Sequence, residues 1–260
     1  MPDNNSSLDK EIIKSLLPEK SKGIDIIVFE SIDSTNTEAK RVFEKDGKDM
    51  LICAEKQTSG RGRQGKTFYS PEKTGIYMTV VIHPDLPLNF ASRATTATAV
   101  AVCEAIEKLT DKKPKINWVN DIFIDNRKVC GILTEAVSLE NNNIADGLII
   151  GIGINISTTR FPDEIKDIAG SLNTQDVDRN TLIAEICKRV TNYTSDLQNS
   201  GYIEDYKKRC FVLGKEITFE QSGKTYNATA LDIDKNGGLI VKTSDGKTET
   251  LKSGEISIKV

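Results

Sequence analysis

The sequence predicts an α+β protein in which a mixed or antiparallel sheet packs against helices and a small β-barrel follows. Three observations lead to this prediction. Runs typical of strands recur between residues 24 and 157. Two stretches, 91–109 and 179–199, carry apolar residues at helical spacing. After about residue 212, short strands separated by glycine-containing turns have the spacing of a compact barrel of SH3-like size. We therefore expect a short N-terminal extension over 1–23, a main domain over 24–211 and the barrel over 212–260.

Strands and helices alternate in the first half of the main domain. Thr35 and Glu38 have the spacing of a capping box, and apolar residues at helical spacing follow them. Residues 59–71 are rich in glycine and polar side chains, which predicts no regular element. The elements expected here are a short helix over 8–17 and strands over 24–32, 50–57 and 75–83, with the long helix over 91–109.

A β-meander is expected in the second half, because turn residues separate β-rich runs there. An amphipathic helix closes the main domain. In order, the expected pieces are strand 115–124, turn Asp125-Asn126, strand 128–139, turn Asn141–Asn143, strand 145–157 and helix 179–199.

Composition excludes several classes of protein. The chain of 260 residues has a net charge of -3, whereas domains that grip nucleic acid are usually basic. It shows neither a signal peptide nor an apolar run close to the ~20 residues that span a bilayer. We therefore expect a cytoplasmic protein with no nucleic-acid and no membrane partner. A winged DNA-binding module, on the order of 60 residues long, does not fit before Ile24.

The cysteines and the histidine argue against disulfide bonds, zinc sites and most histidine-dependent catalysis. The five cysteines form no C-x-x-C pair, which indicates reduced thiols. The one histidine, His83, precedes Pro84 at the end of an apolar run, where a structural role is expected. Clustered zinc ligands are absent from the sequence. A histidine-dependent nucleophile would therefore have to rest on His83 alone.

The most informative segment is Gly60-Arg61-Gly62-Arg63-Gln64-Gly65-Lys66. Its glycines let the backbone come close to a ligand, and Arg61, Arg63 and Lys66 supply donors suited to phosphate oxygens. The spacing is that of neither a P-loop nor a Rossmann turn. Such a loop suits a lid that closes over an anionic intermediate. A solvated basic loop between strands is the alternative.

Two further segments have residue types suited to chemistry. A tight turn is expected to bring Asp121, in Trp118-Val119-Asn120-Asp121, near Lys128, although surface charge pairs are common. Gly151 and Gly153 lie inside a predicted strand, where glycine marks the close approach of a backbone or ligand. A tightly packed strand is the alternative there.

The order and gaps of these motifs give the chain a family resemblance. The segments that carry it are Ser34-Thr35-Asn36, Gln57, Gly60–Gly65, Asn120-Asp121, Lys128-Val129-Cys130-Gly131-Ile132-Leu133, Gly151–Asn155 and Ser253-Gly254-Glu255-Ile256-Ser257. With these segments in this order, the chain resembles the biotin–protein ligase family from about residue 24 to the C-terminus. The resemblance implies a class II synthetase-like domain that binds biotin and ATP over 24–211 and the SH3-like barrel over 212–260.

The resemblance implies a reaction in two steps. Biotin attacks the α-phosphorus of ATP to give biotinyl-5′-AMP, and a lysine of a biotin carboxyl carrier domain of a biotin-dependent carboxylase then displaces AMP. Two anions meet in the first step, so cations are needed to offset their repulsion. ATP and Mg²⁺ are the implied cofactors, with Mg²⁺ expected near Asp121. The resemblance leaves a homodimer open.

Roles for individual residues also follow from the resemblance. The implied catalytic residues are Lys128, Arg63 and Asp121. The implied biotin-binding residues are Ser34, Thr35, Asn36, Gln57, Gly60, Arg61, Gly62, Arg63, Tyr77, Lys128, Gly131 and Gly153. The implied ATP-binding residues are Arg61, Arg63, Phe68, Asn120, Asp121, Lys128 and Asn155.

The chain departs from the family pattern at three positions. Asn117 and Val119 stand where the family often has lysine and proline, and Phe68 stands where it commonly has tryptophan. By the resemblance, the missing lysine puts one phosphate contact of the family in question for this chain. Lys115 lies two residues earlier on the same predicted strand and is a candidate to supply the missing charge.

Two other functions remain as alternatives. A lipoate or octanoate ligase would share the fold, but its Arg-Arg-x-(Ser)-Gly-Gly-Gly signature is missing here. A non-catalytic biotin sensor that regulates transcription is the other alternative. The short segment before residue 24 and the lack of a basic region argue against it.

Overall fold

A mixed sheet forms the larger part of the protein, as predicted, and it has seven strands. The computed structural model describes residues 7–46, 48–84, 86–88, 90–138, 143–174, 177–221 and 223–258. The strand order is β1-β2-β3-β9-β7-β6-β5; β1 and β2 are parallel and the other neighbouring pairs are antiparallel. The strands are β1 (Asp25–Phe29), β2 (Met50–Ala54), β3 (Gly75–Ile82), β5 (Lys115–Asn117), β6 (Asp121–Ile124), β7 (Arg127–Val137) and β9 (Gly147–Asn155).

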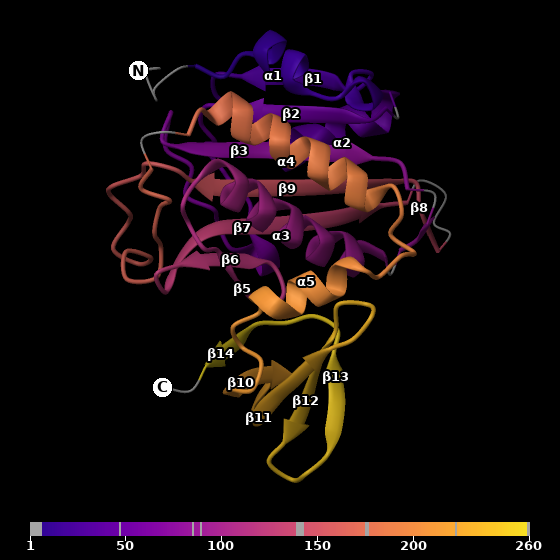
Figure 1. Cartoon of the computed structure of the whole chain (residues 1–260), viewed down its shortest axis with the longest axis vertical. Helices are drawn as coiled ribbons and strands as arrows, with labels where there is room; N and C mark the ends of the chain where they lie inside the picture. Colours follow the sequence, from indigo (N-terminus) through magenta and orange to yellow (C-terminus); the bar gives the residue numbers. More distant parts are fainter. Residues whose placement is uncertain are drawn as a thin grey trace.

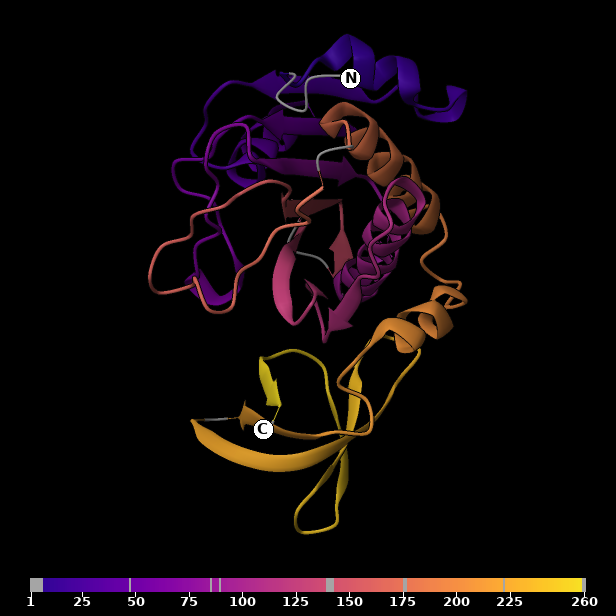
Figure 2. The ribbon, with the colours of Figure 1, turned by 60° about the vertical axis from the view of Figure 1, so that its left-hand side comes forward.

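The two faces of this sheet are covered differently (Figures 1 and 2). The helices α3 (Phe90–Leu109) and α4 (Arg179–Thr194) lie across one face, and α1 (Lys10–Leu16) packs against α4. On the opposite face, α2 (Thr35–Asp46) packs against β2, β3 and β9. Side chains alternate between the faces of a strand. Every second residue of β3, β7 and β9 therefore points away from α3 and α4, and the candidate site lies on that side.

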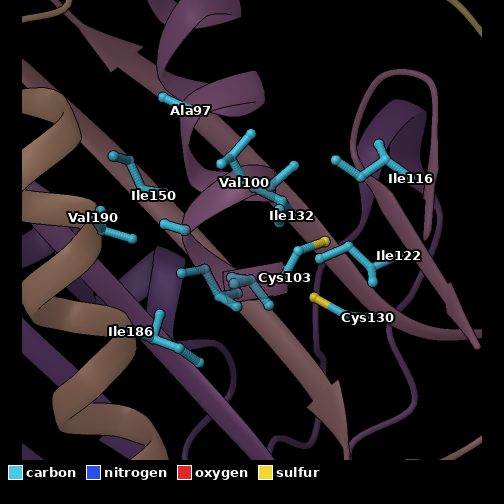
Figure 3. Packing of buried hydrophobic residues seen from close by; sticks show 14 of the residues in the cluster. Ala97, Val100, Cys103, Ile116, Ile122, Cys130, Ile132, Ile150, Ile186 and Val190 are labelled. Carbon is cyan, nitrogen blue, oxygen red and sulfur yellow. The ribbon is translucent and has the colours of Figure 1, made fainter. Parts of the chain in front are cut away.

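The core between the sheet and α3 is closely packed (Figure 3). Val100 and Cys103 of α3 lie over Ile132 and Cys130 of β7, and all four side chains are buried. The five cysteines are free and buried, so the prediction of free thiols is confirmed. Burial raises the pKa of the Cys187 thiol to about 12, which keeps it protonated and unreactive.

A second sheet of five antiparallel strands forms the predicted SH3-like barrel, which we call the C-terminal barrel. Its order is β13-β12-β11-β10-β14. Its apolar residues belong to the same buried cluster as Ile116 and Ile122 of the large sheet, so the two sheets share one continuous core. The strands are β10 (Glu216–Gln221), β11 (Lys224–Ile233), β12 (Leu239–Thr243), β13 (Thr248–Leu251) and β14 (Ile256–Ile258), while β4 (Leu86–Pro87) and β8 (Ile144–Ala145) pair separately.

Besides shifts of a few residues at element ends and the unpredicted short pair β4 and β8, three differences from the prediction stand out. Residues 115–124 form two strands, β5 and β6, because the chain turns at Trp118–Asn120 and pairs Asn117 with Asp121. The helix α4 ends at Thr194, since the polar residues after it bond to the backbone; Ser195 Oγ donates to the Asn192 carbonyl (2.8 Å). The helix α5 (Tyr202–Arg209) was missed, although acidic residues in its first turn and basic residues in its last turn are a recognisable signal.

Local turn chemistry was predicted with mixed success. Thr35 is the first residue of α2 and not its cap, because its backbone N–H donates to Gln57 Oε1 (2.9 Å) and its hydroxyl lies 3.2 Å from the same atom. The predicted turn at Asp125-Asn126 is confirmed, with φ values of 50° and 61° that suit a tight hairpin. The predicted turn at Asn141–Asn143 falls mainly outside the described residues. One 3-10 turn, Arg63–Gly65, forms within the irregular stretch 59–71.

The segment before β1 is an integral part of the fold. Ile13 of α1 is completely buried, and the backbone N–H of Leu8 donates to Glu55 Oε1 (2.6 Å). The other oxygen of Glu55 lies 2.6 Å from Arg179 Nη1, and the two side chains are only 6% and 1% exposed. This buried ion pair joins the end of β2 to the start of α4 and to the N-terminal segment.

Removing one member of this pair should strongly destabilise the fold. Arg179→Met leaves the Glu55 carboxylate buried without its cation, so the free energy of unfolding should fall by about 3–5 kcal/mol. Urea unfolding measures the change. Arg41→Met is the control, because Arg41 pairs with Asp33 at an exposed position and its loss should hardly move the unfolding midpoint. Equal shifts in both variants would contradict the prediction.

Candidate active site

A pocket of about 450 Å³ opens on the side of the sheet away from α3 and α4. Its volume suits a small-molecule ligand. All residues predicted for the site line it except Gly60 and Tyr77. The predicted residues in the lining are Ser34, Thr35, Asn36, Gln57, Arg61, Gly62, Arg63, Phe68, Asn120, Asp121, Lys128, Gly131, Gly153 and Asn155.

Gly60 and Tyr77 lie behind the lining and support it. The hydroxyl of Tyr77 donates to the Pro71 carbonyl (2.8 Å), and its ring meets Phe68 edge-on at 6.5 Å. Burial raises the pKa of Tyr77, so the hydroxyl remains a donor. A Cβ at Gly60 would collide with the Phe68 carbonyl oxygen. Both residues therefore hold the segment that carries Phe68.

One end of the pocket is polar and buried. Ser34, Thr35 and Asn36 at the start of α2 are each less than 5% exposed. Thr79 Oγ1 lies 2.8 Å from both Thr35 Oγ1 and Asn36 Oδ1, and Gln57 Nε2 donates to Ser70 Oγ (2.9 Å). Thr79 was not predicted, although a polar residue within the apolar strand β3 is a signal for it. These bonds fix several donors and acceptors at one place.

The strand glycines make room for side chains that line the pocket. A Cβ at Gly151 would collide with the Asn36 amide, and a Cβ at Gly153 would lie 2.5 Å from the Phe68 ring. Gly131 pairs with Gly153 across β7 and β9, and its Cβ would lie 3.3 Å from the same ring. The predicted close approach is confirmed, and the groups that approach are Asn36 and Phe68.

The other end of the pocket is charged. Lys128 Nζ lies 2.7 Å from Asp121 Oδ2, so the predicted proximity of these two residues is confirmed. Asn120 Nδ2 donates to Asp121 Oδ1 (3.0 Å) and to the Ile132 carbonyl (3.0 Å). Arg63 Nη1 donates to Asn120 Oδ1 (2.8 Å). The four side chains therefore form one connected chain from the loop to β7.

Two buried amide oxygens in the lining have no partner among the described residues. Asn155 is 5% exposed; its Nδ2 donates to the Gly170 carbonyl (2.9 Å), while its Oδ1 accepts no hydrogen bond. Asn117 Oδ1 is likewise buried and unpaired. An unpaired buried acceptor is costly. A ligand with an N–H or O–H donor at these places would recover that cost.

The C-terminal barrel contributes a wall that the sequence did not reveal. Residues 254–257 line the pocket, and Glu255 Oε2 lies 2.6 Å from Lys66 Nζ of the glycine-rich loop. Lys66 also lines the pocket, whereas Lys115 is exposed and outside the lining. The expectation that Lys115 supplies the charge missing at position 117 is therefore not supported, because β5 directs it to solvent.

The one histidine lies away from the pocket. The His83 ring stacks on Phe43 (4.9 Å between centroids) and its Nδ1 lies 2.6 Å from Asp49 Oδ1, which fits the predicted structural role. No group of three or more metal-binding side chains occurs within the described residues. Among the same residues, no helix combines the length and the apolar character needed to cross a membrane.

Comparisons with known proteins agree with this architecture. The model of the biotin/lipoate A/B protein ligase family matches residues 28–155, and that of the biotin protein ligase C-terminal domain matches 212–259. The bifunctional ligase/repressor BirA of Bacillus subtilis is 32% identical over 92% of this chain and 76% of its own length. The biotin–[acetyl-CoA-carboxylase] ligase of Mycobacterium tuberculosis is 24% identical over 96% of this chain and 95% of its own.

Solved structures give the same result. The biotin protein ligase from Aquifex aeolicus in complex with biotin and ATP superposes with a TM-score of 0.74 at 26% identity, covering 90% of this chain and 98% of that one. The chain therefore belongs to the biotin/lipoate A/B protein ligase family, and it is a ligase of the biotin protein ligase group within that family.

Glu135 of β7 is a residue near the pocket that the sequence did not single out. Its carboxylate accepts from both terminal nitrogens of Arg61 (2.9 and 3.0 Å) and from Asn36 Nδ2 (3.0 Å). It therefore connects the glycine-rich loop to α2 and to the sheet. Only its contacts reveal it, because Arg61 is distant in the sequence.

Loss of Glu135 should loosen the glycine-rich loop. Trypsin can cleave after Arg61, Arg63 and Lys66, and cleavage needs the loop to open locally. For Glu135→Ala we expect cleavage about threefold to fivefold faster than in the wild type, since a partly exposed ion pair contributes up to about 1 kcal/mol. Glu107→Ala, which removes an ion pair with Arg209 elsewhere, is the matched control. Identical cleavage rates in the two variants would rule out this role of Glu135.

Proposed function

We propose that this ligase activates biotin with ATP and transfers the biotinyl group to a lysine of a biotin carboxyl carrier domain. The observation that carries the proposal is the connected array of Arg63, Asn120, Asp121 and Lys128 at one end of a pocket whose other end is polar and buried. The polar end suits a ureido ring, and the charged end suits phosphates. The solved relative that binds biotin and ATP supports the same assignment.

The first step joins two anions. A carboxylate oxygen of biotin forms a bond to the α-phosphorus of ATP, and the bond from that phosphorus to the bridging oxygen of pyrophosphate breaks. Lys128 and Arg63 are placed to offset the charge that accumulates around the α-phosphate. Asn155 Oδ1 is a suitable acceptor for the amino group of adenine. The products are biotinyl-5′-AMP and pyrophosphate.

The residues present fit a Mg²⁺ ion that is held mainly by the nucleotide. Asp121 offers a carboxylate at the charged end of the pocket, with the Asn120 amide beside it. Mg²⁺ commonly binds one or two carboxylates together with phosphate oxygens and water. The ion would withdraw charge from the phosphates, and Asp121 would hold it near Lys128.

The second step transfers the acyl group. The ε-amine of the acceptor lysine forms a bond to the acyl carbon of biotinyl-5′-AMP, the bond from that carbon to the phosphate oxygen breaks, and AMP leaves. The amine proton passes to water. The carrier domain as acceptor is supported by the name of the mycobacterial relative, a biotin–[acetyl-CoA-carboxylase] ligase.

Pyrophosphate exchange tests the proposed function. Purified protein should exchange labelled pyrophosphate into ATP when biotin is present, because the first step is reversible. Lipoate and octanoate, offered in turn, should give no exchange. Exchange that depends on lipoate or octanoate and not on biotin would assign the enzyme to the other branch of the family.

Lys128→Met should slow adenylation at least ~100-fold, by analogy with loss of one transition-state donor. Methionine keeps the apolar stem and removes the charge, so the loss reports electrostatics. The measurement is the rate of biotin-dependent pyrophosphate exchange. Lys115→Met and Lys112→Met, both outside the pocket lining, should exchange at the wild-type rate. A loss confined to Lys115→Met would restore its compensating role, and normal exchange by Lys128→Met would remove Lys128 from the mechanism.

A further inference from the structure

The turn Trp118–Asn120 carries the charged end of the pocket and is held from two directions. On the pocket side, the backbone N–H of Ile132 donates to the Asn120 carbonyl (3.0 Å). On the far side, Trp118 Nε1 donates to the Gly237 carbonyl in the C-terminal barrel (2.9 Å), and the Tyr206 hydroxyl of α5 donates to the Val119 carbonyl (3.0 Å). Both far-side bonds are buried and come from residues remote in the sequence.

Tyr206 is well suited to fix this turn. Its side chain is completely buried, and burial raises the pKa of its hydroxyl well above the usual range, so the group is always a donor. Its acceptor, the Val119 carbonyl, belongs to a residue that is 6% exposed. Without the hydroxyl, that carbonyl would be left without this donor in a buried place, which is costly.

We propose that Tyr206 is a positioning residue for the nucleotide end of the pocket, an inference that rests on the proposed function. Val119 directly precedes Asn120 and Asp121. Arg63 Nη1 now lies 2.8 Å from Asn120 Oδ1, and Lys128 Nζ lies 2.7 Å from Asp121 Oδ2. Movement of the Val119 peptide would lengthen both contacts. Hydrogen bonds of this kind weaken steeply with distance and angle. Tyr206 therefore acts on the nucleotide through the turn, without touching it.

The effect should be larger for the nucleotide than for biotin, because Arg63 and Lys128 would meet only the carboxylate end of biotin. The polar end of the pocket is built from α2, β3 and the segment that follows β2, through Thr35, Thr79 and Gln57. Trp118 Nε1 bonds to Gly237 and the Tyr206 hydroxyl bonds to Val119, both away from those residues. A general loss of stability would instead weaken both ends of the pocket together.

Tyr206→Phe tests the proposal, with Tyr202→Phe as its matched control. Tyr202 lies on the same helix and is 5% exposed, but its hydroxyl donates to the Arg93 carbonyl on α3 (3.1 Å) and not to the turn. We expect Tyr206→Phe to raise the KM for ATP about fivefold to tenfold in pyrophosphate exchange, as loss of one buried hydrogen bond permits. Its KM for biotin should rise by a clearly smaller factor. Tyr202→Phe should change neither the KM for ATP nor the KM for biotin. The melting temperatures of the two variants should fall by similar amounts.

Direct binding of an ATP analogue that resists cleavage between the α and β phosphates gives a second readout, measured by calorimetry with biotin present. Tyr206→Phe should bind the analogue more weakly than the wild type and Tyr202→Phe do. Equal nucleotide affinities in the two variants, or a parallel rise in the KM for biotin, would overturn the positioning role. A wild type that binds the analogue but shows no biotin-dependent exchange would overturn the proposed function, and the binding comparison would still decide the role of Tyr206.

Discussion

Strands β3, β7 and β9 have to serve two environments at once, and much of the site follows from this constraint. Because side chains alternate along a strand, Ile150, Ile152 and Ile154 of β9 enter the core beneath α3 and α4. The intervening positions Gly151 and Gly153 then face the pocket. Side chains larger than hydrogen at those two positions would displace Asn36 and Phe68. One strand therefore provides both the apolar core and the floor of a ligand site.

The elements above this floor come from distant parts of the chain and are held by a small number of polar contacts. Glu135 connects Arg61 and Asn36, Lys66 meets Glu255 of the C-terminal barrel, and the Trp118–Asn120 turn is fixed by Tyr206 and Gly237. Partly exposed pairs such as the first two contribute little to stability and can exchange partners. The buried bonds to the turn are different, because breaking them leaves unpaired groups. The glycine-rich loop can therefore move while the turn that carries Asn120 and Asp121 stays fixed.

The sequence predicted what is local and missed what depends on distant contacts. The mixed sheet, the barrel and the motif residues of the pocket were predictable, since periodicity and motif order report them directly. Thr79 and Glu135 were not predicted, because their partners lie far away in the sequence and the only local signal was a polar Thr79 within an apolar strand. The hairpin at 115–124 was missed because Ile116 and Trp118 continue an alternating pattern typical of one strand. The pairing of Asn117 with Asp121 and the bond from Trp118 to Gly237 show that the chain turns there. The role of residues 254–257 in the pocket wall required knowledge of how the barrel packs.

Because Asn117 is neutral, binding of the phosphates depends on the other cations of the pocket. Four cations line the pocket: Arg61, Arg63, Lys66 and Lys128. Three of them are already matched by a carboxylate, namely Arg61 by Glu135, Lys66 by Glu255 and Lys128 by Asp121. Within the part of the chain that the structure describes, Arg63 forms no ion pair, and its Nη1 donates instead to the neutral amide of Asn120. An unmatched guanidinium keeps its full charge for an incoming anion, whereas a paired cation must first exchange its partner. Arg63 is therefore the cation of this pocket whose charge is directly available to phosphate, and its dependence on Asn120 connects that charge to the turn that Tyr206 holds.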